Sequence, residues 1–348
     1  MLISLHIMPT NLSIQKSNRF SNSQGLACSL SRNRSIKLQT IRAISQIPAM
    51  QQKITILNNR GEKLVGVLHE SGSSKIVVLC HGFRSSKENN TLVNLTAALE
   101  NEGISVFRFD FSGNGESEGS FMYGNYSSEV EDLRAVIEYF KKVNRLTVAA
   151  IGHSKGISNL CIINWTNIHQ EIKVATVEEL VVSGPSTVRM GITELVVSGP
   201  STVRMGGNVV LLYASKYHDI GAVVNVSGRC DLERGIKERL GKDYLERLEK
   251  DGFIEVKTKA GDYKVTEESM RERLSTSMHD VCHSIDVGCR VFTVHGSLDE
   301  IVPVGDAIEF SKIIPNHQLQ IIDGADHRFS SHEHELASAV FHFVKGCF

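Results

Sequence analysis

From Lys53 onward the chain alternates short apolar runs with segments of helical periodicity, and this rhythm limits the possible fold more than any other feature. Runs such as Lys75–Cys80 are continuously apolar, which is typical of strands buried on both faces of a parallel sheet. Leu92, Leu95 and Leu99 between them repeat at helical spacing. The strand candidates are Lys53–Leu57, Lys63–Leu68, Lys75–Cys80, Ser105–Phe109, Leu146–Ile151, Ala222–Val226, Arg290–Val294 and Gln318–Ile322. The pattern predicts a doubly wound α/β sheet with its functional groups at the carboxyl ends of the strands.

Two capping boxes mark expected helix starts. Ser128 with Glu131 lies at the start of one apolar helical stripe, and Ser330 with Glu333 precedes the last one. In such a box the serine hydroxyl accepts a bond from the helix and the glutamate bonds back to the cap. We therefore expect a helix to begin at each serine.

The most informative strand end is the sequence G-x-S-x-G over Gly152–Gly156, directly after an apolar run. A tight turn between a strand and a helix there lifts a serine hydroxyl out of the sheet, the arrangement called a nucleophile elbow. Ser154 is the candidate nucleophile. The alternative is an ordinary glycine-rich connection without chemistry.

Acyl transfer also needs hydrogen-bond donors for the carbonyl oxygen as it becomes negative. The residue after the nucleophile, Lys155, would supply one backbone N–H. The other would come from Phe83, which follows the strand Lys75–Cys80 and the residues His81 and Gly82.

Two later strand ends supply a carboxylate and an imidazole. Asp299 follows the strand candidate Arg290–Val294 and a glycine turn, and His327 follows the last strand. The chain order Ser154, Asp299, His327 is the one expected for a catalytic triad on this architecture. Asp231 is a reserve acid, and Asp326 is a poorer candidate because adjacent side chains diverge.

These motifs together resemble the serine-dependent α/β-hydrolases, especially the serine aminopeptidase-like and monoacylglycerol lipase-like branch with its cinnamoyl esterases. The run Asp110–Ser117 reads D-x-x-G-x-G-x-S, as in those families. The resemblance implies an α/β-hydrolase fold and hydrolysis of small or acyl carboxylic esters without metal or organic cofactor. It also implies a small helical cap, which we place at 231–285, with short helices over Leu232–Lys250 and Glu267–Leu274 and a hairpin over Gly252–Lys264.

One segment departs from the family pattern. Glu179–Gly191 is repeated residue for residue at Glu194–Gly206, with a period of fifteen. Joining Gly156 to Gly207 restores an uninterrupted elbow and helix, so we interpret 157–206 as an insertion or as translated intron sequence. Cys161 and Trp165 have helical spacing, so a substitute helix within the segment is the other possibility. If the helix after the nucleophile is displaced, activity is weak or absent. The alternative to an esterase is therefore a catalytically impaired or silent hydrolase-fold protein, either a binding module or a mis-spliced isoform.

The first part of the chain is unlike the rest. Residues 1–61 contain eight Lys or Arg and no acid, and nine serines lie between Ser4 and Ser45. This composition is typical of an organellar transit peptide, and Ile41-Arg42-Ala43 resembles a plant chloroplast cleavage site. We therefore expect a chloroplast leader over 1–49, followed by a single hydrolase domain over 50–348. The alternatives are a basic tail and a cytoplasmic protein that begins at Met50.

Composition excludes several other functions. No apolar run approaches the ~18 residues that span a bilayer, and a formal net charge of −1 argues against nucleic acid as the main partner. The seven cysteines are widely spaced and odd in number, which argues against a disulfide framework. Two sets of possible metal ligands are incomplete, and we expect neither to bind metal. They are His279 with Cys282 and His283, and His332 with His334.

Overall fold

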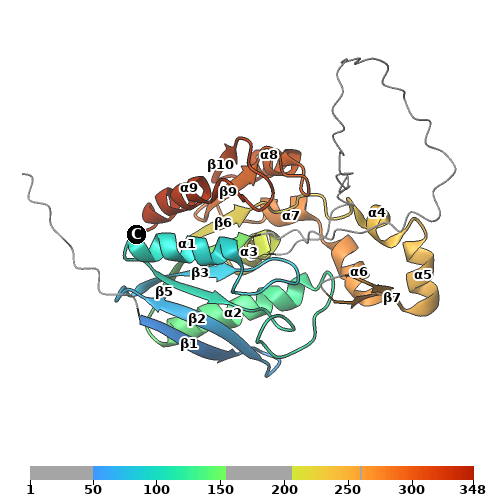
Figure 1. Ribbon diagram of the computed structural model, residues 1–348, viewed down its shortest axis with the longest axis horizontal. Coiled ribbons are helices and arrows are strands. Elements are labelled where there is room, and N and C mark those ends of the chain that lie inside the picture. The colour runs from blue at the N-terminus through green and yellow to red at the C-terminus, as the bar shows by residue number, and fades with distance from the viewer. Residues whose placement is uncertain (1–49, 154–205, 259–260) are drawn as a thin grey trace, which may run out of the picture. The chain divides into compact units, whose positions relative to one another are not determined.

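A computed structural model describes residues 50–153, 206–258 and 261–348. Within them an eight-stranded sheet has the spatial order β1-β2-β4-β3-β5-β6-β9-β10 (Figure 1). Its strands are β1 Met50–Leu57, β2 Lys63–Glu70, β3 Lys75–Cys80, β4 Ser105–Phe109, β5 Leu146–His153, β6 Ala222–Val226, β9 Arg290–Gly296 and β10 His317–Ile322. β1 and β2 run antiparallel to their neighbours, and all other pairs are parallel. The predicted mostly parallel sheet is confirmed.

The order of the strands reverses at β3. This strand pairs with β4 on one side and with β5 on the other. Chain connections then leave in opposite directions, and open α/β sheets bind their ligands at the carboxyl ends of the strands at such a point. In this chain these are the ends of β3 and β5, at Cys80 and His153.

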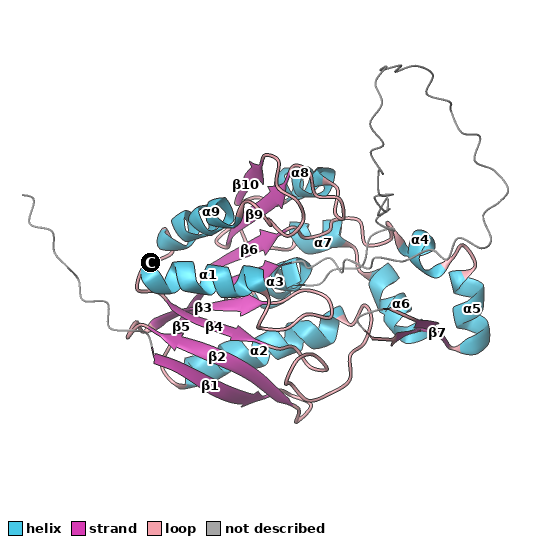
Figure 2. Ribbon diagram, in the orientation of Figure 1, coloured by secondary structure: helices cyan, strands magenta, loops and turns pink. Residues whose placement is uncertain are grey.

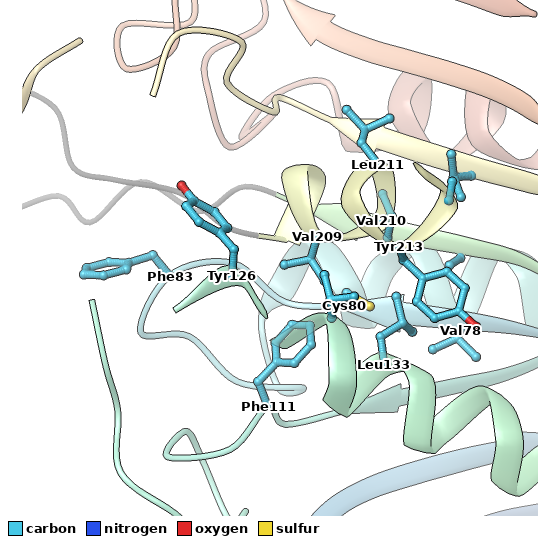
Figure 3. Packing of buried hydrophobic residues seen from close by; sticks show 14 of the residues in the cluster. Val78, Cys80, Phe83, Phe111, Tyr126, Leu133, Val209, Val210, Leu211 and Tyr213 are labelled. Carbon is cyan, nitrogen blue, oxygen red and sulfur yellow. The ribbon is translucent and has the colours of Figure 1, made fainter. Parts of the chain in front are cut away.

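Helices cover both faces of the sheet (Figure 2). α1 Asn90–Asn101 and α9 Glu333–Lys345 pack on one face in one apolar cluster. α2 Tyr126–Lys142, α3 Gly206–Tyr217, α7 Met278–His283 and α8 Val304–Ile313 contribute to the cluster on the other face, part of which is drawn in Figure 3. The predicted leucine stripe of α1 is buried in the first cluster, because its three leucines share one helical face.

Both predicted capping boxes are wrong. α2 begins before Ser128, at Tyr126, and the Ser127 N–H is bonded by Glu272 Oε1 at 2.7 Å instead of by a local serine. α9 begins at Glu333, and the Ser330 hydroxyl donates to Asp326 Oδ2 at 2.8 Å. At α2 a carboxylate from another helix replaces the local cap, whereas the N-cap residue of α9, His332, forms no side-chain cap.

A small second layer lies beside the carboxyl ends of the strands (Figure 1). Its elements are α4 Ile236–Leu240, α5 Tyr244–Asp251, β7 Phe253–Val256, β8 Tyr263–Thr266 and α6 Glu267–Ser275. β7 and β8 form an antiparallel hairpin, as the sequence predicted. α7 contacts α3 and α8, so it belongs to the main helical layer although it falls inside the predicted cap range. No helix in the described ranges is long and apolar enough to cross a membrane.

Candidate active site

The structure brings Asp299 and His327 together. Asp299 follows β9 and His327 follows β10, and these strands are parallel neighbours, so their loops meet at one edge of the sheet. His327 Nδ1 lies 2.5 Å from Asp299 Oδ2, and both side chains are fully buried. A carboxylate in this place holds the proton on Nδ1 and leaves Nε2 as the basic nitrogen of the ring.

Four hydrogen bonds hold the Asp299 carboxylate. Oδ1 accepts the backbone N–H groups of Ile301 and Val302, at 2.9 and 2.7 Å. Oδ2 is 3.2 Å from His295 Nε2, in addition to its bond with His327. Burial would raise the pKa of Asp299, but hydrogen bonds from the two histidines and their charge outweigh burial and hold this pKa well below its usual range. The group is therefore a carboxylate at neutral pH.

His295 is a partner of Asp299 that the sequence reasoning missed. Its Nε2 also lies 2.9 Å from the carbonyl oxygen of Val302, so this nitrogen carries a proton shared between two acceptors. The signal was present in the spacing, because His295 stands four residues before Asp299 at the end of the same strand.

His327 also lies next to the end of β5. Its ring is nearly parallel to that of His153, with the ring centroids 6.0 Å apart. Its backbone N–H donates to Glu300 Oε2 at 3.2 Å, which fixes the loop. His153 is the last described residue before the predicted nucleophile. Ser154 and Lys155 lie outside the described residues, as do both copies of the duplicated segment except Gly206, the last residue of the second copy.

The start of α3 lies against the end of β5. A Cβ at Gly152 would lie 1.9 Å from the Gly206 carbonyl oxygen, and a Cβ at Gly206 would lie 2.5 Å from the His153 carbonyl oxygen. Only two residues without side chains can approach so closely. The helix that packs beside the end of β5 is therefore α3, although residues 154–205 lie between the two elements in the chain.

The loop after β3 is held by His81. Its Nδ1 donates to the Gly82 carbonyl oxygen at 2.7 Å, and its Nε2 accepts the Phe111 N–H at 3.1 Å. Because a trans peptide keeps C=O and N–H on opposite sides, the bond to Gly82 also sets the direction of the Phe83 N–H. The predicted donor Phe83 is buried and lies directly beyond the end of β3.

The D-x-x-G-x-G-x-S run is a supporting loop. Asp110 Oδ2 pairs with the Lys87 ammonium at 2.7 Å, and its Oδ1 accepts the Lys87 N–H at 2.6 Å. Gly115 has φ +54°, and a Cβ there would lie 2.3 Å from the same carboxylate. The Ser117 hydroxyl donates to the Asp110 carbonyl oxygen at 2.6 Å. These contacts explain the motif as a packing requirement beside the site.

The other candidate acids are used elsewhere. Asp231 is exposed, and its Oδ1 accepts the backbone N–H groups of Glu233 and Arg234. Asp326 accepts bonds from Arg328 and Ser330. Asp231 is thus engaged in a local turn, whereas Asp299 is the carboxylate that contacts His327.

Metal ligands do not converge in the part of the chain described here. No group of three or more His, Cys, Asp or Glu side chains in it could hold a metal ion. The rings of His279 and His283 pack 4.6 Å apart, while Cys282 is buried beside the core.

Comparison with protein families and with curated protein sequences finds two similarities. Residues 72–189 match the family described as serine aminopeptidase, S33. An uncharacterised protein of Saccharomyces cerevisiae, YDL057W, is 23% identical over 261 residues, which cover 74% of this chain and 69% of the yeast protein.

Solved structures agree over most of the chain. Est1E of Butyrivibrio proteoclasticus, solved with ferulic acid, has a TM-score of 0.60 at 20% identity, covering 84% of this chain and 98% of Est1E. An esterase of Pyrococcus furiosus has a TM-score of 0.55 at 20% identity, covering 85% and 91%. Mouse alpha/beta hydrolase domain-containing protein 10 has a TM-score of 0.57 at 15% identity, covering 85% and 100%. The chain therefore has the α/β-hydrolase fold, and its residues 72–189 are similar to the serine aminopeptidase family.

Proposed function

We propose that this protein is a serine hydrolase of carboxylic esters, with Ser154 as nucleophile, His327 as general base and Asp299 as the acid that orients it. The observation that carries the proposal is the buried 2.5 Å contact between Asp299 and His327. The His327 ring also lies beside the ring of His153, the last residue of β5. Ser154 is the next residue in the chain.

The proposed reaction follows from these positions. His327 Nε2 accepts the Ser154 hydroxyl proton while the serine oxygen attacks the ester carbonyl. The Phe83 and Lys155 backbone N–H groups stabilise the oxyanion, and Asp299 stabilises the imidazolium. His327 returns the proton to the leaving alcohol. Water then hydrolyses the acyl-enzyme by the same path.

The second candidate is a hydrolase-fold protein without activity. It is favoured by the exact duplication within 157–206. The contact between Gly152 and Gly206 supports the interpretation that α3 is the helix that follows the elbow in the family and that the intervening residues are inserted. An insertion at this junction separates Ser154 from α3 along the chain.

The test uses the full chain, the Ser154→Ala variant, and a variant in which Gly156 is joined to Gly207. Each is assayed with p-nitrophenyl butyrate and with ethyl ferulate, and each is labelled with a fluorophosphonate. The esterase proposal expects labelling and hydrolysis that Ser154→Ala abolishes. Equal rates for the full chain and Ser154→Ala would contradict it. Activity found only after the deletion would show that the insertion silences the enzyme.

We also propose that residues 1–49 direct the protein to the chloroplast, on the evidence of their basic, serine-rich, acid-free composition. Fused to a fluorescent protein, these residues should give import into chloroplasts of plant cells. Diffuse cytoplasmic fluorescence would favour translation from Met50.

A further inference from the structure

Two arginines and two tyrosines are buried together between the second layer and the sheet. We call Arg229, Arg273, Tyr123 and Tyr126 the arginine–tyrosine cluster. Arg273 comes from α6, Arg229 from the loop after β6, and the tyrosines from the segment that starts α2. All four are between 0% and 2% exposed. Enclosed guanidinium groups are costly unless an anion or a full set of acceptors compensates them.

Arg273 lacks such compensation. Its Nη1 donates to the Tyr126 hydroxyl oxygen at 2.6 Å, and its guanidinium lies 5.6 Å from the ring centre of Tyr123 and 6.0 Å from that of Tyr126. Its Nε and Nη2 are buried and have no hydrogen-bond acceptor in the described part of the chain. Two nitrogens of a charged group, which together carry three N–H donors, are thus enclosed without a partner among the described residues.

Arg229 adds a second charge beside the first. Its two terminal nitrogens donate to the carbonyl oxygens of Arg234 and Ile301, each at 2.5 Å, and its buried Nε has no acceptor among the described residues. Burial lowers the pKa of Arg229, and repulsion from the neighbouring Arg273 lowers it further, against the attraction of Asp306. The two arginines therefore repel each other across the cluster.

The groups around the cluster do not neutralise it. Burial raises the pKa of Tyr126 to about 12, so its hydroxyl stays protonated. The Tyr123 hydroxyl is buried and also has no hydrogen-bond partner among the described residues. Burial, together with the charges of Asp132 and Glu272, raises the pKa of the nearby Glu129 well above its usual value, which favours the neutral acid. Asp306 is already paired with Arg234 at 3.0 Å.

The cluster reaches both sides of the proposed active site. The Tyr123 ring lies 6.1 Å from that of Phe83, whose N–H is the proposed oxyanion donor. On the other side, Arg229 holds the carbonyl of Ile301, and the N–H of Ile301 holds Asp299. Figure 3 shows Phe83 and Tyr126 at one end of the apolar cluster, beyond Cys80 and Val209.

We propose that the arginine–tyrosine cluster binds an anionic group carried by the ester substrate, namely a carboxylate, and that the enzyme therefore prefers half-esters of dicarboxylic acids. A carboxylate offers several acceptor positions in one plane, and a guanidinium presents its donors in the same geometry. The inference rests on the proposed esterase function. Free inorganic anions share this chemistry, so the experiment separates the two sources.

The kinetic test compares monoethyl adipate with ethyl hexanoate, which has the same acyl length without the carboxylate. Ethanol release is measured for the wild type, Arg273→Gln and Arg271→Gln. The wild type should favour the half-ester, and Arg273→Gln should lower the ratio of the two kcat/KM values by about tenfold, chiefly through the KM of the half-ester. Arg271→Gln should leave the ratio unchanged, because this arginine is exposed on the same helix and paired with Glu267.

The binding test needs no activity. Adipate should raise the thermal midpoint of the wild type more than hexane-1,6-diol does, and Arg273→Gln should remove the difference. If Arg273→Gln does not fold, Tyr126→Phe takes its place, since Tyr126 orients the guanidinium. An Arg273-dependent shift with adipate, in a protein that hydrolyses no ester, would keep the anion site and overturn the esterase.

Two results would overturn the inference. The first is that the wild type shows no preference for the half-ester, or that Arg273→Gln and Arg271→Gln both keep the wild-type preference. The other is an equal midpoint shift with inorganic phosphate and with adipate, without any preference among esters, which would assign the cluster to free anions.

Discussion

Two sides of the proposed site enclose opposite charges and compensate them differently. On one side the Asp299 carboxylate accepts four hydrogen bonds, from two backbone N–H groups and two imidazoles. On the other side the Arg273 guanidinium has one hydrogen bond to the protein and two enclosed nitrogens without an acceptor in the described residues. Both side chains are shielded from solvent.

The difference indicates two roles. A carboxylate whose acceptor positions are all hydrogen-bonded is held in one orientation. A group that positions a catalytic base must be fixed in this way. A guanidinium with unpaired donors is stabilised when an anion binds to it, and this is the property expected of a group that recognises a ligand. The four predictions below test this comparison, beginning with the largest effect.

Replacing Asp299 by Asn should lower kcat for p-nitrophenyl butyrate by about 10³–10⁴-fold. The amide presents an N–H group toward His327 and so favours the tautomer in which Nε2 is protonated and cannot act as a base. Asp231→Asn is the matched control, because that carboxylate only closes a turn. Retention of more than a tenth of the activity by Asp299→Asn would contradict the assignment of the acid.

Replacing Gly152 by Ala should disturb the whole site, because the new methyl group moves α3 away from the end of β5. The new Cβ would lie 1.9 Å from the Gly206 carbonyl oxygen and 2.9 Å from the Gly207 nitrogen. We expect the free energy of unfolding, measured with urea, to fall by about 3 kcal/mol. Gly221→Ala meets no atom within 4 Å and should change it by less than about 0.5 kcal/mol. Equal values for the two variants would show that the contact is not tight.

The sequence predicted the acid side of the site and missed the arginine side, for a physical reason. Asp299 and His327 each follow an apolar strand, and parallel neighbouring strands bring such positions together whatever the rest of the chain does. Arg273 meets Tyr126 across 147 residues, where α6 touches the first residues of α2. No local pattern marks that contact, and the same is true of Glu272, which replaces the predicted serine cap of α2.

The strand positions were predicted well, because continuous apolar runs report burial on both faces directly. The two capping boxes were predicted wrongly, because the first N–H groups of a helix donate to any nearby carboxylate, local or distant, as in the bond from Ser127 to Glu272. The role of His295 was missed although its spacing from Asp299 was visible, since a histidine inside a buried strand has no distinctive sequence signature.

The acid side should also make stability depend on pH. Since the pKa of Asp299 lies below its unfolded value of about 3.9, its stabilisation is complete above that value and is lost as the pH falls toward the folded pKa. Urea midpoints measured between pH 6 and pH 2 should therefore fall more steeply for the wild type than for Asp299→Asn, by an amount equivalent to about 2 kcal/mol. Parallel curves would mean that the carboxylate is not stabilised by its two histidines.

The smallest expected effect tests most directly whether the Asp299 carboxylate and the Arg273 guanidinium have different roles. Arg273→Met removes an enclosed charge whose donors are largely unmatched, so the free energy of unfolding without ligand should rise by about 1 kcal/mol despite the lost bond to Tyr126. Arg145→Met is the control, because the Arg145 guanidinium is bonded to Glu70 and to the Ser73 carbonyl oxygen and its loss should be destabilising. Urea unfolding of both variants makes the measurement. If Arg273→Met costs as much stability as Arg145→Met, the guanidinium serves to attach α6 to α2, and no ligand is needed to explain its burial.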